Sequence, residues 1–455
     1  MRAIRWAKGF GLLFVQCSPA QGEELIARVC DDVTDKAIDV LRLEGEVDNL
    51  YETVAALPKV DKTNVLFITG LEKSLVPYIK PGYGSEGDYY AKDTVPKILG
   101  KLNLQREKFR ETLKLCFVFL VPPYAMKYLI RRAADFFDWR SGIWEFVGPL
   151  EELQQEAYRL LKDNDFERYL NLTPQQRCER FLAIEDLLEH NDGSAENVSE
   201  LLREQGRLLD ADGNHKKAIN YFDAALKVKP SYPEALNSKG IVLNDLGHHE
   251  EAIICYDTAL AIKSNYHHAL TNKGDALDDL GKYEEAITCY DAALVLKPDH
   301  VHALGNKGFM LSKLGRYEEA VAHHDAALAI QPDYHYAPQG KGEAFESLGK
   351  YEEAIACYDA ALTIKPDFHY ALNNKGVVLG KLGRYEEAIG CYDAALAIQP
   401  EDHEALNNKG ITLRNLGRYE EAILCYEAAL AIKPDYQLAL DNKEEALEKL
   451  ADASH

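Results

Sequence analysis

The chain has 455 residues, a length that predicts two or three folding units. Hydrophobic residues make up 47% of the sequence and charged residues 28%, a composition typical of an ordered globular protein and not of a disordered one. The net charge of −22 argues against a general nucleic-acid binder or a binder of anionic membranes, because phosphate contacts need a basic surface.

The nine cysteines indicate a reducing compartment. Their number is odd, no two have CxxC spacing, and the last five recur at a regular spacing. Neither a disulfide framework nor a zinc site has this pattern. The positions are Cys17, Cys30, Cys116, Cys178, Cys255, Cys289, Cys357, Cys391 and Cys425. We therefore expect a cytoplasmic location.

The first residues, "MRAIRWAKGFGLLFVQCSPAQG", have the outline of a signal peptide, with a basic start, an apolar run and small residues. However, the uninterrupted apolar part, "LLFV", is shorter than the roughly 7–15 residues of a signal peptide. A buried first strand is the preferred interpretation. No apolar run approaches the ~20 residues of a membrane span, so we expect no membrane partner.

Residues 1–148 predict an α/β domain with a mostly parallel sheet. Four runs are apolar throughout, which is typical of strands covered on both faces. The predicted strands are Phe10–Gln16, Ala37–Leu43, Asn64–Gly70 and Leu115–Val121. Between and after them, helices are predicted at 19–32, 47–57, 94–113 and 123–133, with Ser18 as the N-cap of the first.

The turn after the first strand, "CSPAQGEE", stands where a phosphate-binding loop would lie. Such a loop needs several glycines, a lysine and a Ser or Thr, but only Gly22 is present, and Glu23 and Glu24 would repel phosphate. The third strand ends in Thr69 and not in a magnesium-binding Asp. Nucleotide hydrolysis is therefore not expected, and no cofactor is predicted.

A polar cluster in "RRAADFFDWRSG" is a possible N-terminal site, because Arg and Asp beside aromatic rings can bind phosphate. Its residues are Arg131, Arg132, Asp135, Asp138 and Arg140. The preferred alternative is a salt-bridged helix end. Residues 1–148 contain no histidine, the commonest general base, which also weakens a hydrolase hypothesis.

A period of 34 residues dominates the rest of the chain. Two glycine series begin at Gly206 and Gly213, and alanines recur in step with them. The predicted divisions are an α/β domain at 1–148, a helical linker at 149–198, seven repeats at 199–436 and a capping helix at 437–455. Repeats of this length cannot bury their apolar faces alone, so they must stack.

Each copy predicts two helices. In the copy that contains "NNKGVVLGKLGRYEEAIGCYDAALAIQP", Gly383 ends the first helix, and Pro400 ends the second. The small residues Gly376, Ala388 and Ala395 mark positions where the helices approach closely.

The repeats closely resemble the tetratricopeptide repeat (TPR) family. Besides the glycines and alanines, an aromatic residue and a terminal proline recur, as Tyr392 and Pro400 do. Ser264, His324 and a lysine series that includes Lys375 depart from the family pattern. The resemblance implies a right-handed superhelix whose first helices line a groove for a peptide or a partner protein. Residues 1–148 as a whole, with the segments "LNLQREKFRETLKLCFVFLVPPYA" and "FFDWRSGIWEF", look like the degenerate P-loop NTPase-type domains found before TPR arrays in bacterial signalling ATPases of the STAND class.

The predicted binding residues are the positions on the first helices that vary between copies and that we expect to face outward into the groove. They are Asn237, Asn244, Asp245, Thr271, Asp275, Asp278, Asp279, Phe309, Lys313, Gln339, Glu343, Glu346, Asn373, Lys381, Asn407 and Arg414. The early copies are acidic and the last two mildly basic, which suggests an extended ligand with basic character at one end. A solvated face with no special ligand is the open alternative.

Histidines gather between copies, as in "NYHHA" and "DHVHA". We expect His267, His268, His302, His335, His369 and His403 to stack at the repeat spacing and not to converge on one metal ion, so no metal site is predicted. A polar seam between repeats, or part of the binding face, is the preferred interpretation.

The leading hypothesis is a non-enzymatic cytoplasmic adaptor or scaffold, with a protein or peptide partner in the groove and a regulatory or docking N-terminal domain. A nucleotide-dependent switch or enzyme that uses the α/β domain is the alternative. Self-association of the array stays open.

Overall fold

The computed structural model describes residues 4, 9–76, 96–132, 140–145, 169–190 and 194–453. The chain divides into two compact units between Val242 and Leu243. The first unit holds a β-sheet, the helices that cover it, a further helix α9 and the first helix pair of a repeat array. The second unit consists of helices alone.

Within the described residues, the sheet has five parallel strands in the order β2-β3-β4-β1-β5. The strands are β1 Gly11–Gln16, β2 Ile38–Arg42, β3 Val65–Thr69, β4 Cys116–Val121 and β5 Gly142–Glu145. The first four lie inside the predicted apolar runs. The predicted fold class, a parallel α/β sheet followed by an all-helical array, is confirmed. Sequence reasoning missed β5, because its four residues are too few to show a pattern.

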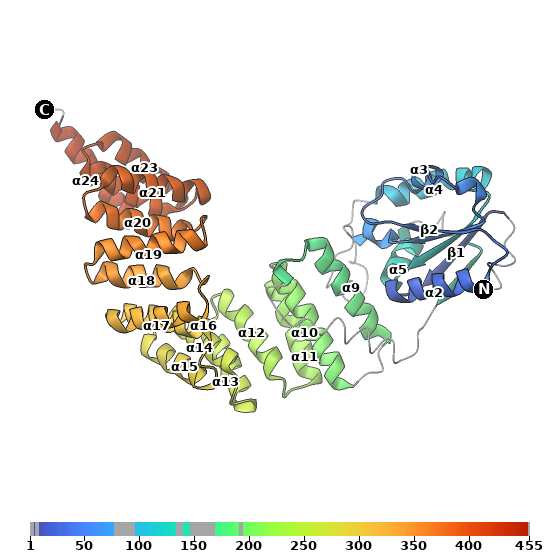
Figure 1. Ribbon diagram of the computed structural model, residues 1–455, viewed down its shortest axis with the longest axis horizontal. Helices are drawn as coiled ribbons and strands as arrows, with labels where there is room; N and C mark the ends of the chain where they lie inside the picture. Colours follow the sequence, from blue (N-terminus) through green and yellow to red (C-terminus); the bar gives the residue numbers. More distant parts are fainter. Residues whose placement is uncertain are drawn as a thin grey trace. The chain divides into compact units, whose positions relative to one another are not determined.

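Helices cover both faces of the sheet (Figure 1). They are α2 Pro19–Asp32, α3 Leu50–Ala55, α4 Lys97–Thr112 and α5 Pro123–Arg132, all within the predicted ranges. Ile26 and Val29 of α2 pack on one face, whereas α3, α4 and α5 supply the core of the other. Ser18 caps α2 in a capping box with Gln21, as its position predicts.

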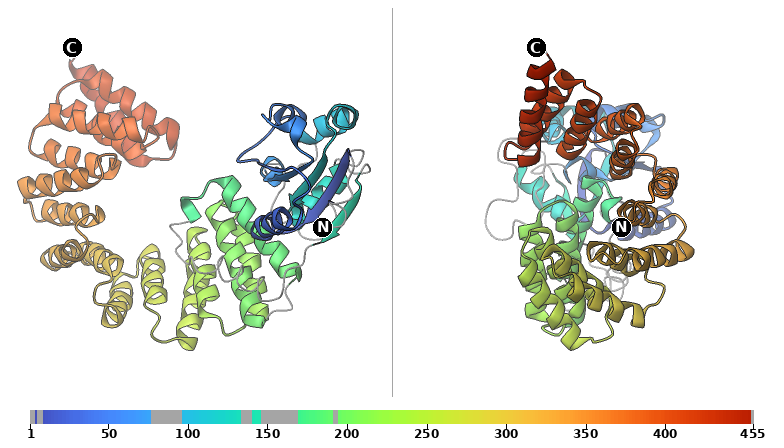
Figure 2. Two further views of the ribbon diagram at one scale, coloured as in Figure 1. Left: turned by 45° about the vertical axis from the view of Figure 1, so that its right-hand side comes forward. Right: turned by 90° about the vertical axis from the view of Figure 1, so that its left-hand side faces the viewer.

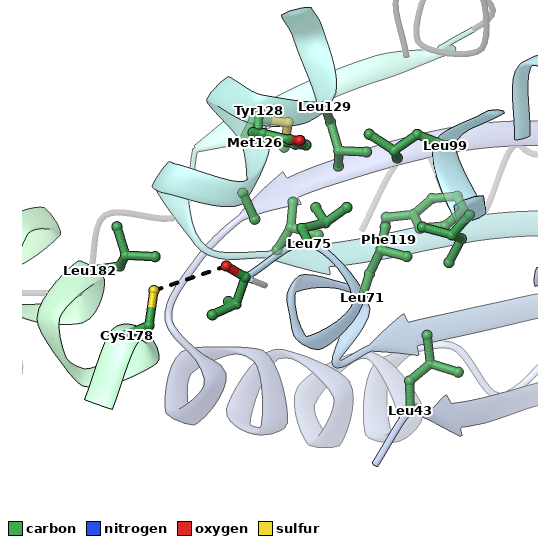
Figure 3. Close-up of a cluster of buried hydrophobic side chains, with 14 of the residues drawn as sticks. Leu43, Leu71, Leu75, Leu99, Phe119, Met126, Tyr128, Leu129, Cys178 and Leu182 are labelled. Carbon is green, nitrogen blue, oxygen red and sulfur yellow. Dashed lines mark hydrogen bonds between the residues drawn. The ribbon is translucent and has the colours of Figure 1, made fainter. Parts of the chain in front are cut away.

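The larger core continues from the sheet into α9 (Pro174–His190) and the first repeat. Leu75, which follows β3, is buried in the same cluster as Leu182 of α9 (Figure 3). The thiol of Cys178 also lies 4.0 Å from the Val76 carbonyl oxygen, to which it donates a weak hydrogen bond. The C-terminal half of the predicted linker is therefore a core element of the first unit.

The array consists of seven helix pairs and one further helix. The first helices are α10 Ala195–Ala211, α12 Pro233–Asp245, α14 His267–Asp279, α16 Val301–Lys313, α18 Tyr336–Ser347, α20 His369–Lys381 and α22 His403–Asn415. The second helices are α11 His215–Val228, α13 His249–Ile262, α15 Tyr283–Leu296, α17 Tyr317–Ile330, α19 Tyr351–Ile364, α21 Tyr385–Ile398 and α23 Tyr419–Ile432. Figure 2 shows the pairs of the second unit stacked in sequence order, ending in α24 Gln437–Ala453.

The recurring residues explain the geometry of each copy. Gly383 ends α20 with a φ of 76°, a left-handed conformation that favours glycine. Lys375, a departure from the family pattern, donates a hydrogen bond to Asp359 of the preceding copy at 2.5 Å. The same pairing joins six other lysines to an acid 16 residues earlier: Lys239, Lys273, Lys307, Lys341, Lys409 and Lys443. The lysine series therefore bridges consecutive copies.

Among the described residues, no helix has the length and apolar composition needed to cross a bilayer.

Candidate functional site

Four predicted binding residues are buried in the array. Asn237, Thr271, Asn373 and Asn407 are each less than 9% exposed. Asn373 and Asn407 are buried because the next copy covers them. The Asn408 amide of the next copy, for example, donates a hydrogen bond to Asn373 at 3.2 Å. The expectation that these four side chains face outward is therefore wrong, because a position that varies between copies can still lie against the neighbouring helix.

Asp275 belongs to a hydrogen-bond network and not to an open surface. Its carboxylate accepts from the Tyr290 hydroxyl at 2.7 Å and from the Asn306 amide of the next copy at 2.8 Å. Burial raises the pKa of the Asp275 carboxyl, and these two hydrogen bonds partly oppose that rise. The residue thus contributes to the stacking of adjacent copies.

Glu343 of α18 repeats this arrangement two copies later. Its carboxylate accepts from Gln339 at 2.9 Å and from Asn374 of the next copy at 3.0 Å. Burial again raises the pKa of the carboxyl. Since a carboxylate only accepts, it orients both amides with their NH₂ groups toward it.

The charged groove positions pair between adjacent copies. Asn244 donates to Asp279 at 2.8 Å, and three ion pairs follow along the array. They are Lys313–Asp278 at 2.7 Å, Lys381–Glu346 at 2.7 Å and Arg414–Glu445 at 2.5 Å. Each basic residue of the predicted gradient is therefore paired with an acid of the array. Asp245 is an exposed acid near the start of the array. The predicted basic end is locally compensated.

Most of the N-terminal candidate site lies outside the described residues. Arg131 and Arg132 end helix α5, but their side chains, like Asp135 and Asp138, are not among the described groups. Arg140 precedes β5 and is exposed. The proposed phosphate-binding cluster stays a prediction.

The β1–α2 turn uses its own hydrogen-bond donors. The Ser18 backbone N–H donates to the Gln21 side chain at 2.9 Å, and the Gln21 N–H donates to the Ser18 hydroxyl at 3.3 Å. The Cys17 N–H donates to the Val121 carbonyl at 3.1 Å. Phosphate loops offer such N–H groups to their ligand. A phosphate here would have to displace these bonds, which agrees with the presence of only one glycine, Gly22, in the turn.

Three histidines converge at the junction before α16, contrary to the expected stacking. Side-chain nitrogens of His267, His268 and His300 lie within 4.8 Å of one another. The reason is that the loop before α16 places His300 against the start of α14. Nδ1 of His300 accepts from the Ala303 N–H at 3.2 Å, so the proton of the neutral ring is on Nε2. With its proton on Nε2, His300 has no free lone pair for a metal ion. Only His267 and His268 could each offer one ring nitrogen.

Aromatic rings run along the starts of four consecutive first helices. Buried His300, Tyr334 and Phe368 form an inner row with partly buried Tyr266; the outer row consists of the exposed His268, His302, Tyr336 and Tyr370. We call these eight residues the ring ladder. The inner and outer rows touch, with centroids 5.4 Å apart for His302 and Tyr334 and 5.6 Å apart for Tyr336 and Phe368.

A hollow of about 410 Å³ opens beside the ring ladder. Its size is within the range of about 300–1,000 Å³ that is typical of ligand pockets. The lining residues are His302, Asn306, Phe309, Tyr334, Tyr336, Gln339 and Tyr370. Two predicted groove residues, Phe309 and Gln339, are thus brought together with rings from three consecutive copies.

Comparison with known families agrees with this architecture. Models described as "Tetratricopeptide repeat" match residues 203–267, 271–335 and 367–435, and one described as "TPR repeat" matches residues 342–383. The helical array is a tetratricopeptide repeat array. No curated protein sequence matches the chain significantly.

Solved structures with the same repeat fold include a TPR protein from Parabacteroides merdae, 19% identical, with 56% of this chain and 100% of that chain covered and a TM-score of 0.48. TTC0263 from Thermus thermophilus is 24% identical over 41% of this chain and 100% of that chain, with a TM-score of 0.37. YrrB, described as a TPR protein with an unusual peptide-binding site, is 23% identical over 42% of this chain and 97% of that chain, with a TM-score of 0.32.

Sequence reasoning missed Tyr336 and Tyr370, although it placed His268 and His302 of the outer row in a polar seam or on the binding face. His268, His302, Tyr336 and Tyr370 recur every 34 residues, so the series is readable in the sequence. The property that these four residues share is an exposed ring at one repeat position, and this shared ring is the signal in the sequence that groups them.

Proposed function

We propose that this protein is a non-enzymatic adaptor whose TPR array holds an extended segment of a partner protein along the first helices. TPR arrays are generally protein-interaction scaffolds. The observation that carries the proposal is the hollow beside the ring ladder, where the exposed Tyr336 and Tyr370 meet polar groups from α16 and α18. Exposed tyrosines are favoured at interfaces because one ring offers both apolar area and a hydroxyl.

We place the protein in the cytoplasm, where its array binds a partner protein or peptide of basic character and no nucleic acid. The α/β domain acts as a regulatory or docking unit in a signalling context and resembles a STAND-type domain without the phosphate loop. Its five parallel strands and the self-bonded β1–α2 turn support a fold that does not bind phosphate at that turn.

A photo-crosslinking amino acid at Tyr370 tests the adaptor function in the full chain. In extract of the source cells, we expect discrete protein adducts from this position. The matched control carries the same group at Ile254, which is 65% exposed on the second helix α13. Adducts from Tyr370 that are absent from Ile254 support the proposal. Equal adducts from both positions, or none from Tyr370, contradict it.

The nucleotide-dependent alternative is tested separately on the same full chain. We expect no saturable binding of ATP or GTP in equilibrium dialysis. Saturable binding that is lost in Arg140→Ala would instead favour a switch that uses the N-terminal domain.

A further inference from the structure

We propose that the hollow beside the ring ladder is a subsite for an arginine side chain of the partner segment. This inference rests on the proposed function and names the chemistry that the TPR array recognises. It follows from the walls of the hollow, the polar groups beside it and the local charge.

The walls are aromatic and partly open to solvent. Tyr336 is 42% exposed and Tyr370 54% exposed, and both line the hollow together with the partly buried Phe309. Faces of aromatic rings attract cations, and a planar guanidinium stacks on them while its edge still donates hydrogen bonds. The ammonium of lysine is more strongly hydrated and cannot stack in this way. The walls therefore favour arginine over lysine.

The two amides that line the hollow are held from behind by carboxylates. Asn306 donates its NH₂ group to Asp275, and Gln339 donates its NH₂ group to Glu343. The carbonyl end of each amide is thus turned away from its carboxylate. Oε1 of Gln339 is buried and has no hydrogen-bond partner. An unsatisfied buried acceptor is unfavourable, and a hydrogen-bond donor from a ligand that reaches this oxygen would satisfy it.

The charge around the hollow is negative. The carboxyls of Asp275 and Glu343 are hydrogen-bonded to the two amides. Further acids lie near them, Asp278 and Asp279 beside Asp275 and Glu346 beside Glu343. Lys313 also lies near Glu343 but is paired with Asp278. A bound cation would complement this surplus of acid, whereas an acidic ligand would be repelled.

The hollow is larger than one side chain. Its volume of about 410 Å³ leaves room for the backbone that flanks an arginine. Of the outer row, only His268 lies outside the hollow, one copy before His302. An extended segment with arginine in the hollow could therefore continue toward the ring of His268.

Selection of a random 12-residue peptide library on the full chain tests the inference. The library is first depleted on the double variant Tyr336→Ala/Tyr370→Ala, whose exposed rings should be dispensable for folding. The depleted pool is then selected on the unmodified protein, with Ile254→Ala as a control that should select the same peptides. We expect enriched peptides that share an arginine at one fixed position.

Synthetic versions of an enriched peptide then separate the contribution of the arginine charge to binding from the contribution of its shape. We expect replacement of the shared arginine by citrulline, a neutral isostere, to weaken binding about tenfold in calorimetry. In Glu343→Gln, the arginine peptide should lose affinity while the citrulline peptide does not. Asp278→Asn offers the same comparison at a more accessible acid, should Glu343→Gln fold poorly.

The outcomes distinguish this inference from the proposed function. Enriched peptides that bind the hollow without a fixed cation, or equal affinities of the arginine and citrulline peptides, overturn the arginine subsite and leave the adaptor function standing. No enrichment above the depleted double variant overturns both. A lysine that replaces arginine without loss of affinity refutes the preference for the guanidinium.

Discussion

The ring of Tyr392 lies against the backbone of Gly376, so that a Cβ atom on this glycine would come within 2.6 Å of the ring. The two residues belong to the two helices of one copy, α20 and α21. The same contact recurs in other copies, for example between Gly410 and Tyr426, where the distance is 2.5 Å. The glycine series therefore exists because a buried ring occupies the space of a side chain.

We expect Gly376→Ala to destabilise the array by about 1–3 kcal/mol, because the ring or the helix must move to admit the methyl group. Urea unfolding followed by circular dichroism measures the change. The matched control is Gly390→Ala in the same copy, where nothing lies within 4 Å of the added atom. This control should gain about 0.5–1 kcal/mol, because glycine is a poor helix former. Equal effects of the two changes would contradict the contact.

Reversing the charge of single acids in the early copies should destabilise the array by unequal amounts. We expect Asp275→Lys to destabilise the array by about 3–5 kcal/mol, since it removes the acceptor of Tyr290 and Asn306 and places a cation among buried groups. Asp279→Lys changes an exposed residue and should cost less than about 1 kcal/mol. Thermal unfolding of the two single variants measures the difference.

A simultaneous charge reversal of Asp275, Asp278 and Asp279 would therefore lower the stability of the array as well as any affinity for a partner. Asp275 has to be left unchanged in any variant designed to test partner binding. If Asp275→Lys unfolds no more readily than Asp279→Lys, the network around Asp275 contributes nothing to stability.

The buried His324 makes the stability of the array depend on pH. Its side chain is fully buried, and neither ring nitrogen has a hydrogen-bond partner. Burial lowers the pKa of His324 to about 4, below its usual value of 6.5. Between these values the unfolded chain binds more protons than the folded chain, so the free energy of unfolding falls as the pH falls.

We expect His324→Phe to stabilise the array by about 1–3 kcal/mol at pH 7, because it removes two unsatisfied buried nitrogens. From pH 7 to pH 4.5, the variant should lose about 2 kcal/mol less than the unmodified protein. Urea unfolding at both pH values measures this. His248→Gln, an exposed histidine of the same array, is the control, and an identical pH dependence of all three proteins would refute the prediction.

Each lysine–acid pair of the series should contribute modestly to the stability of the array. Lys375 and Asp359 are partly exposed, with side-chain exposures of 23% and 52%, so we expect a coupling free energy of about 0.5–1 kcal/mol. A double-mutant cycle with Lys375→Met and Asp359→Asn measures it. The coupling should shrink in 1 M salt. A coupling of zero at low salt would mean that the lysine acts only through its apolar stem.

Much of the fold could be predicted from local pattern. The 34-residue period, the strand-like runs such as Asn64–Gly70 and the N-cap at Ser18 all record relations between residues close in sequence or one copy apart. Four strands and seven helix pairs lie where these patterns place them. The four residues of β5 are too few to show such a pattern.

The residues of the candidate site could not be identified from the repeat pattern alone. A repeat position says that a residue lies on the first helix, but not whether the next copy covers it, so the burial of Asn373 and Asn407 could not be seen in advance. In the same way, the meeting of His267 and His268 with His300 depends on the loop between two copies. These are distances across a junction, and a one-dimensional period contains no information about them.

The sequence by itself determined that this protein is a stack of helix pairs joined to a parallel α/β sheet, because glycine, alanine and apolar spacing act locally on the backbone. Only the tertiary structure decided which variable residues remain open to a ligand. Stacking buries some of them, pairs others with acids of the adjacent copy, and gathers rings from three copies around one hollow. That selection is made by packing between copies, which no single copy encodes.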